Sequence, residues 1–172
     1  SVAVLPKDPR HEKVRDSKQC SALERAQLYQ WIRQHHRVKI TALSASDIDR
    51  WGISYCNQEV MRRALYQQVS LHGDKRILKT LIDGRLKFKL PTYFNAEWIV
   101  KGDTLSYAIA SASIVAKHVR DYIMKRFEKH FPEYGLADHK GYGTAAHLSS
   151  LKTVGLSPIH RRSFCQSLLS SQ

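Results

Sequence analysis

The chain has few cysteines and no long apolar segment. Its three cysteines, Cys20, Cys56 and Cys165, are far apart and form no C-x-x-C pair. This number and spacing argue against a disulfide framework or a zinc site. They favour a reducing compartment, for which we expect the cytoplasm, with an organelle as the alternative. No apolar run is long enough to cross a membrane, and the apolar start is too short for a secretory signal, so we expect no membrane partner.

Acidic residues are the second shortage. The 172 residues include 28 Lys and Arg against 15 Asp and Glu, which gives a formal net charge of +13. Such an excess of positive charge attracts polyanions and speeds encounters with them. Nucleic acid is therefore the expected partner. A chain of this length and ordinary hydrophobic content is expected to form one domain with a sizeable core.

Strand patterns and helix patterns alternate along the chain, which predicts an α/β layered fold. Ser21 with Glu24 predicts a helix that begins with a capping box, and Ser46 with Asp49 predicts the start of a second helix, interrupted at Gly52. The expected strands span residues 2–5, 38–45, 77–82 and 96–100, with a turn at residues 73–75.

The longest helical pattern follows Asp103. Small and apolar residues recur at three- and four-residue intervals from Ala108 to Tyr122, which predicts a buried helix reaching about residue 130. Gly102 lets the backbone approach another group closely. Asp103 or Thr104 can cap the helix N-terminus. The alternative is that the Asp103 carboxylate helps to bind a cation or a phosphate.

Two carboxylates occupy matching places in this pattern. Asp83 ends one predicted strand and Asp103 follows the next, and each has a glycine beside it. If the two strands are neighbours in one sheet, both carboxylates lie at the same edge. Magnesium is held by one or two carboxylates together with phosphate oxygens and water, and paired ions support phosphodiester hydrolysis. The alternative is an ordinary turn at Asp83 and a helix cap at Asp103.

Basic and aromatic residues supply candidates for nucleic-acid contacts. Tyr142 lies between two glycines, an arrangement that exposes a ring for stacking on a base or sugar. The alternative is a ring packed over its own loop. Candidates for phosphate binding, which are otherwise solvated surface, are Lys18, Lys101, Lys117, Arg161 and Arg162.

Six short motifs occur in a fixed order over nearly the whole chain. They are Asp16-Ser17-Lys18 with Ser21, Ile82-Asp83-Gly84, Lys101-Gly102-Asp103, residues 110–117 with Arg120-Asp121 and Met124, Gly141-Tyr142-Gly143-Thr144 with His147, and His160-Arg161-Arg162-Ser163-Phe164. Each motif is weak alone, but the ordered series is specific. Because these motifs occur in this order, the chain resembles ribonuclease HII, the type 2 ribonuclease H family.

The resemblance implies a fold and an activity. The fold would be α/β, a ribonuclease H-like mixed sheet flanked by helices with a helical C-terminal part. Residues 1–172 would form one domain, with a core over about 1–130 and a substrate-binding part over about 131–172. The activity would be hydrolysis of the RNA strand of RNA–DNA hybrids and incision 5′ to ribonucleotides embedded in duplex DNA. The products would carry a 3′-hydroxyl and a 5′-phosphate, and the cofactor would be Mg²⁺ or Mn²⁺.

The resemblance also implies roles for single residues. Asp83 and Asp103 match two of the family's four metal-binding acids, and the metal is expected to activate water. Tyr142 matches the tyrosine that packs against the sugar at the RNA–DNA junction. Lys18 matches a lysine near the substrate phosphates. The expected substrate-binding set is completed by Lys101, Thr144, Lys117 and Arg161.

One family feature is absent from this sequence. The family opens with a strand that bears adjacent Asp-Glu, followed by a Gly-Arg-Gly loop, and neither occurs here. Residues 1–5 resemble the family's second strand. A second chain, or a longer form of this one, is therefore expected to supply the first strand, and this chain alone is expected to cleave weakly. The alternative is a catalytically inactive nucleic-acid-binding or assembly module.

Overall fold

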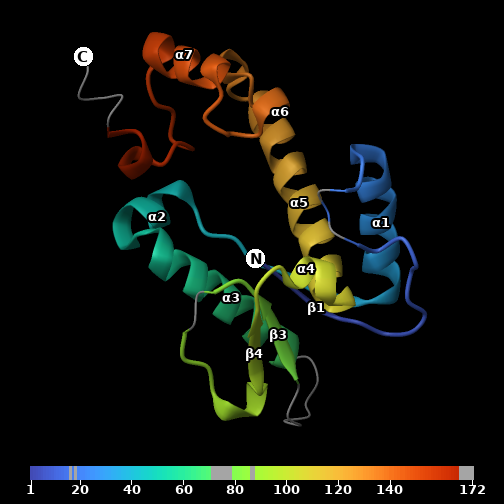
Figure 1. Cartoon of the computed structure of the whole chain (residues 1–172). Helices are drawn as coiled ribbons and strands as arrows, with labels where there is room; N and C mark the ends of the chain where they lie inside the picture. The colour runs from blue at the N-terminus through green and yellow to red at the C-terminus, as the bar shows by residue number, and fades with distance from the viewer. Residues whose placement is uncertain (16, 18, 71–78, 86–87, 167–172) are drawn as a thin grey trace. The chain divides into compact units, whose positions relative to one another are not determined.

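The computed structural model describes residues 1–15, 17, 19–70, 79–85 and 88–166 of the chain (Figure 1). These residues form two compact units. Unit 1 comprises residues 1–42 and 57–118, and unit 2 comprises residues 43–56 and 119–172. Helix α5 (Tyr107–Glu128) contributes its first turns to unit 1 and its last turns to unit 2.

The strands of unit 1 form two pairs of opposite sense. Strand β1 (Val2–Leu5) runs antiparallel to β2 (Arg37–Ile40), with Val2 opposite Ile40. Strand β3 (Thr80–Asp83) runs parallel to β4 (Ala96–Ile99), with Asp83 opposite Ile99 (Figure 1). The mixed strand directions and the surrounding helices confirm the predicted α/β class.

Unit 1 also contains helices α1 (Ala22–His35), α3 (Ile53–Ser70) and α4 (Gly102–Leu105) and the first turns of α5, and α1 packs with β2 and α4 with β3. Helix α1 begins with the predicted capping box, because Ser21 Oγ accepts from the Glu24 N–H and the Glu24 carboxylate accepts from the Ser21 N–H. Its Tyr29 ring stacks on His118 of α5 at 4.1 Å between ring centroids. Ile114 and Val115 are fully buried, which confirms the predicted buried helix.

Unit 2 is helical. Its elements are α2 (Ala45–Trp51), η2 (Pro132–Tyr134), α6 (Leu136–His139), α7 (Ala145–Val154), η3 (Arg162–Phe164) and the last turns of α5. Its core consists of Met124, Tyr134, Leu136 and Leu151. The carboxylate of Asp49 in α2 accepts from the backbone N–H groups of Arg162 and Ser163, each at 2.9 Å, and so anchors η3.

Two predicted boundaries are wrong. The strand expected to reach residue 45 ends at Ile40, and α2 begins two residues before the expected start. Ser44, not Ser46, is the cap, because its Oγ accepts from the Asp47 backbone N–H at 3.1 Å. Two overlapping Ser-x-x-Asp patterns compete here, and only the tertiary structure selects one. The predicted turn at 73–75 and the start of the predicted strand at 77 lie outside the described residues.

The helix expected after Asp103 is interrupted. Helix α4 ends at Leu105 and α5 begins at Tyr107. The prediction that Asp103 or Thr104 caps the helix is also wrong. Lys101 occupies the cap position in a left-handed conformation with φ of 56°, and Thr104 Oγ1 donates to the Lys101 carbonyl. The chain therefore turns into the helix earlier than the capping pattern indicates, and Asp103 lies in the first turn.

Candidate metal and nucleic-acid site

Asp83 ends β3, and Asp103 follows β4 by a few residues, so both lie near the edge where the two strands end. The strands are parallel and Asp83 is opposite Ile99, so both chains leave the sheet at the same edge. The Gly84 N–H closes this edge by donating to the Ile99 carbonyl at 2.9 Å. The Gly102 N–H then donates to Asp83 Oδ1 at 2.9 Å. Asp83 is thus bonded to the residue that directly precedes Asp103.

Gly102 makes this approach possible. A Cβ at this position would lie 2.4 Å from Ile109 Cδ1 and 3.4 Å from Asp83 Oδ1. The sequence predicts that the backbone approaches another group at Gly102, and that group is the Asp83 carboxylate together with the start of α5. Asp103 is buried whereas Asp83 is exposed, so the pair extends from the interior to the surface.

These two carboxylates suit a hard divalent cation. Magnesium prefers oxygen ligands and commonly uses one or two carboxylates, with substrate phosphates and water completing its shell. In the part of the chain that the structure describes, no group of three or more His, Cys, Asp and Glu side chains could hold a metal ion. An ion held by Asp83 and Asp103 would therefore need its remaining ligands from the substrate, from water or from additional carboxylates.

The predicted basic residues of unit 1 differ in their placement. Lys101 is exposed and forms the turn that leads into Asp103. Lys117 lies on α5, in the part of that helix that belongs to unit 1. Lys18 lies outside the described residues. Of these three residues, Lys101 is the one that lies in the turn directly before Asp103.

The predicted residues of unit 2 surround the loop between α6 and α7. Tyr142 is 64% exposed, which favours the prediction of an exposed ring over the alternative of a ring packed over its loop. Thr144 caps α7, and its Oγ1 accepts from the His147 N–H at 3.3 Å. Arg161 precedes η3, and its guanidinium carbon lies 4.2 Å from the centroid of the Phe164 ring.

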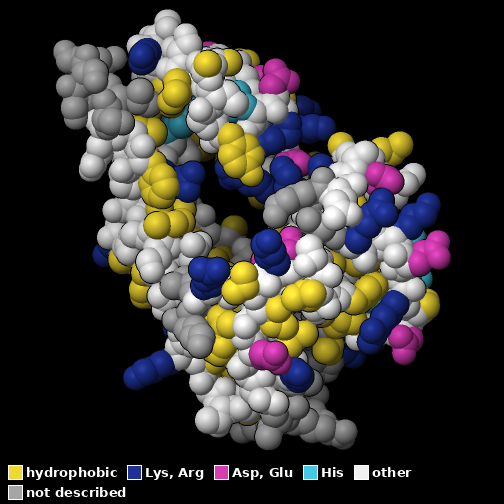
Figure 2. All heavy atoms as spheres, in the orientation of Figure 1, with side chains coloured by type: hydrophobic (Ala, Val, Ile, Leu, Met, Phe, Trp, Pro, Cys, Tyr) yellow, Lys and Arg dark blue, Asp and Glu magenta, His cyan; other side chains and the backbone are white. Residues whose placement is uncertain are grey.

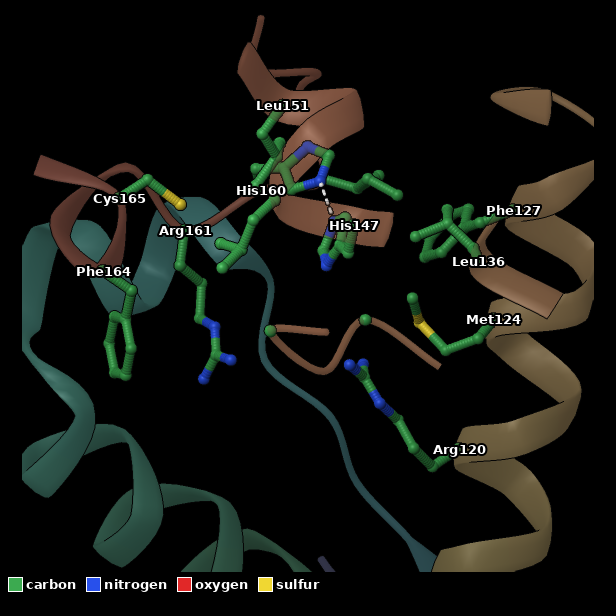
Figure 3. Close-up of a pocket in the computed structure, with 14 residues that line it drawn as sticks. Arg120, Met124, Phe127, Leu136, His147, Leu151, His160, Arg161, Phe164 and Cys165 are labelled. Carbon is green, nitrogen blue, oxygen red and sulfur yellow. Dashed lines mark hydrogen bonds between the residues drawn. The ribbon is translucent and has the colours of Figure 1, made fainter. Parts of the chain in front are cut away.

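A histidine cluster, formed by His139, His147 and His160, supports the Tyr142 loop and was not predicted as a unit. His147 Nδ1 lies 2.9 Å from the Tyr142 carbonyl, and His147 Nε2 lies 3.1 Å from His160 Nε2 (Figure 3). His139 stacks on His147, with 4.3 Å between their ring centroids. The sequence shows only scattered histidines, because the spacing from 139 to 160 has no helical or strand period.

The neighbours of this cluster determine its tautomers. A carbonyl can only accept, so His147 Nδ1 carries the proton and His147 Nε2 accepts. His160 Nδ1 accepts from the Ser157 N–H at 3.1 Å, so His160 Nε2 carries the proton that bonds to His147. Burial lowers the pKa of both His147 and His160, and the proximity of His147 lowers the pKa of His160 further. The bonded arrangement requires both rings to be neutral.

We expect unit 2 to lose stability in mild acid. Because the folded-state pKa values of His147 and His160 lie below the ordinary value near 6.5, their contribution is fully present above about pH 6.5 and is lost as the pH falls below it. Amide hydrogen exchange of α7 and the Tyr142 loop, followed from about pH 7.5 to about pH 5.5, measures this loss.

His160→Phe tests this prediction, and His130→Gln is its control. His160→Phe removes the donor to His147 and should destabilise unit 2 by about 1–3 kcal/mol at neutral pH, while flattening the pH dependence. His130 is exposed, so His130→Gln should keep the wild-type profile. Equal protection at both ends of the pH range in the wild type would contradict the assignment of neutral, bonded rings.

The chain carries more basic than acidic residues, with a formal net charge of +13. On the face shown in Figure 2, Lys and Arg side chains are more widespread than Asp and Glu side chains. No helix among the described residues is long and apolar enough to cross a membrane. A basic α/β protein with two carboxylates near the ends of neighbouring parallel strands has the features expected of metal-dependent enzymes that act on nucleic acids.

Comparisons with known proteins identify the family. The family model described as Ribonuclease HII matches residues 2–167. Ribonuclease HII of Alkaliphilus oremlandii is 35% identical over 98% of this chain and 83% of its own length. That of Magnetococcus marinus is 39% identical over 95% of this chain and 75% of its own length. This chain therefore belongs to the ribonuclease HII family of metal-dependent endoribonucleases.

A solved structure supports the fold. A chain in the structure of the PCNA:RNase HII complex from Archaeoglobus fulgidus matches with a TM-score of 0.63 at 18% identity, over 89% of this chain and 78% of that one. At this identity the match establishes the fold alone. It agrees with the predicted α/β class and with the predicted helical C-terminal part.

Proposed function

We propose that this chain hydrolyses the RNA strand of RNA–DNA hybrids and cuts on the 5′ side of ribonucleotides embedded in duplex DNA. The observation that carries the proposal is the hydrogen bond from the Gly102 N–H to Asp83 Oδ1, because it holds Asp83 beside the turn that bears Asp103. Family membership supports the enzyme over the alternative of a catalytically inactive binding module.

In this proposal Asp83 and Asp103 hold Mg²⁺, or Mn²⁺ in its place. The ion, when bound, would supply Lewis-acid stabilisation of charge on the scissile phosphate. Lys101 and Lys117 would offset the charge of substrate phosphates, as would Lys18. Tyr142, which is largely exposed, would pack against the sugar of the recognised ribonucleotide. Thr144 would act mainly by capping α7 and so fixing one end of the Tyr142 loop.

A groove in unit 1 supports the proposal that a further strand completes this site. The groove has a volume of about 350 Å³ and is lined by β1, β3, α3 and α5. All residues from Ser1 to Val4 and from Leu81 to Asp83 line it. Successive strand residues face opposite sides of a sheet, so a groove over one face would be lined by every second residue only. Consecutive residues of both strands line this groove, which therefore runs along the edges of β1 and β3.

These two edges have no strand partner among the described residues. In that part of the chain β1 pairs with β2 alone and β3 with β4 alone. The floor between them is apolar, with Ala64 and Leu65 of α3 and Ala112 and Ala116 of α5. A single extended strand could pair with β1 on one side and with β3 on the other, which would join the two pairs into one mixed sheet.

The position of Asp83 in this groove indicates which strand would complete the chemistry. A strand parallel to β3 would end beside Asp83, so carboxylates near its C-terminal end would join Asp83 and Asp103. An adjacent Asp-Glu pair there would complete the four acids that the family resemblance implies. The strand would come from a second polypeptide or from a longer form of this chain. We propose the cytoplasm as the compartment, in keeping with the finding that Cys20, Cys56 and Cys165 form no disulfide.

The proposed function predicts a defined product. With Mg²⁺, and with the strand supplied, a DNA duplex that contains one ribonucleotide should be nicked on its 5′ side, leaving a 3′-hydroxyl and a 5′-phosphate. A ligase test and a polymerase extension test of the nick measure these ends, and chelation of the metal should abolish the reaction. An all-DNA duplex is the matched control. Duplex binding without any nicking would instead support the binding-module alternative.

A further inference from the structure

Unit 2 contains a cavity of about 260 Å³ beside the Tyr142 loop. Its floor is apolar and consists of core side chains such as Met124, Leu136 and Leu151. Its rim is formed by α5, by Gly141 and Gly143 of the Tyr142 loop, and by the segment that leads into η3. The cavity therefore lies next to the exposed tyrosine but is formed by other side chains.

Two arginines extend into this cavity from different elements. Figure 3 shows Arg120 reaching from α5 and Arg161 reaching from the segment before η3 toward the same open space. An Arg120 guanidinium nitrogen donates to the Lys140 carbonyl at 3.3 Å, which places the group beside the Tyr142 loop. Arg161 is held by its contact with the Phe164 ring. Both guanidinium groups are thus fixed by other contacts before any ligand arrives.

The absence of a Cβ on Gly141 contributes to this placement. Gly141 has φ of 79°, and a Cβ there would lie 3.2 Å from an Arg120 guanidinium nitrogen and 3.0 Å from Met124 Cε. A side chain at this position would crowd Arg120 and would strain the backbone. The glycine before Tyr142 therefore exposes the tyrosine and also leaves room for the arginine.

The electrostatics of the cavity favour an anion. None of the fourteen lining residues is Asp or Glu. Partial desolvation lowers the pKa of Arg120 and the neighbouring charge of Arg161 lowers it further, although Tyr142 and Asp121 act in the opposite direction. His147 and His160 also line the cavity, and their bonded tautomers are neutral. Two like charges are therefore brought together without a lining carboxylate, and a bound phosphate would relieve their repulsion.

We propose that Arg120 and Arg161 form a binding site for one phosphodiester of the substrate backbone, next to the nucleotide that faces Tyr142. Guanidinium groups match phosphate oxygens in geometry and charge. The site would thereby fix the position of the strand relative to the tyrosine. This inference rests on the proposed function for the identity of the ligand, whereas the pairing of the two arginines belongs to unit 2 alone.

The test measures binding without cleavage. The chain is titrated, with the metal chelated, against a fluorescent DNA duplex that contains one ribonucleotide, over a series of NaCl concentrations. Arg120→Gln and Arg161→Gln should each weaken binding about 10-fold, the loss expected for one charge-assisted contact. Each should also lower the slope of log affinity against log salt by about 1. The double variant should lose less than the product of the single losses, because both arginines contact one phosphate.

The matched control is Arg126→Gln. Arg126 is also on α5 and its substitution removes the same charge, but it does not line the cavity. Its variant should lose clearly less affinity than Arg120→Gln. Thermal unfolding of all variants checks that unit 2 stays folded, and Arg120→Lys, which keeps the charge, should recover part of the affinity.

Neutral backbone linkages then locate the phosphate. A methylphosphonate at the contacted position should weaken wild-type binding but should not weaken binding by Arg120→Gln further. Either of two results overturns the inference: a methylphosphonate weakens duplex binding by the wild type and by Arg120→Gln equally at every position, or Arg126→Gln loses as much affinity as Arg120→Gln. If the wild type does not bind the duplex at all, the proposed function fails instead.

A mononucleotide competition separates two sources of phosphate. Adenosine monophosphate and inorganic phosphate carry the same group without a strand. One outcome would refute the substrate contact: Arg120→Gln abolishes binding of adenosine monophosphate or inorganic phosphate but leaves duplex binding unchanged. The site would then bind small free phosphates. Competition at much higher concentrations than the duplex requires is the expected result.

Discussion

Asp103→Asn is expected to lower Mg²⁺-dependent cleavage by at least about 100-fold in protein that carries the completing strand. Loss of groups that merely orient metal ligands already costs about 10- to 100-fold in metal affinity or activity, and Asp103 is proposed as a direct ligand. Asn keeps the size and one oxygen of the side chain but removes the negative charge. The rate of nicking of a duplex with one ribonucleotide measures the effect.

Two further measurements separate the metal role from a folding role. Asp103 is buried, so its variant is compared with the wild type by thermal unfolding, and Mn²⁺ binding is measured by calorimetry. We expect an unchanged fold and weaker binding. Glu97→Gln is the charge-matched control, since Glu97 is exposed on β4 and pairs with Lys79 at 3.1 Å. Nicking by Asp103→Asn at the wild-type rate would refute the proposed role.

Supplying the proposed strand is expected to raise Mg²⁺-dependent cleavage by at least about 100-fold over this chain alone, because two carboxylates would be joined by two more. A synthetic strand of about seven residues, with alternating apolar side chains and Asp-Glu at its C-terminal end, would be added in excess. It should also raise the melting temperature by several degrees, since it buries apolar surface and binds the folded state.

The control strand carries Asn-Gln in place of Asp-Glu. It should stabilise unit 1 equally, because the pairing edges and the apolar floor are unchanged, but it should not increase cleavage. The intact mass of the purified protein with every co-purifying polypeptide shows whether such a strand is already present. A chain that cleaves at full rate with neither strand nor partner would refute the proposal that the groove must be filled.

The sequence predicted local features wherever one pattern dominated. The capping box at Ser21 and the buried face of α5 required only short-range information, because capping and helical periodicity depend on residues three or four apart. The prediction was wrong where two patterns competed, as at Ser44 and Ser46. It was also wrong at Asp103, where the left-handed turn at Lys101 overrides the capping preference.

The ordered motifs also determined the family, since they relate the chain to known proteins without knowledge of its packing. They identified Asp83 and Asp103 as one pair, but not the Gly102 N–H that joins the two segments. That bond depends on the parallel register of β3 and β4, which brings together two strand ends from separate parts of the chain.

Composition, local patterns and the motif series are properties of the sequence itself, so the sequence alone determined the basic charge, most elements and the family, and it supplied Asp83 and Asp103 as the proposed pair of acids. The tertiary structure alone decided the histidine cluster behind Tyr142, the groove along β1 and β3, and the convergence of Arg120 and Arg161. The physical reason is that each of these depends on contacts between residues far apart in sequence. Such contacts form only when packing selects one among many possible pairings.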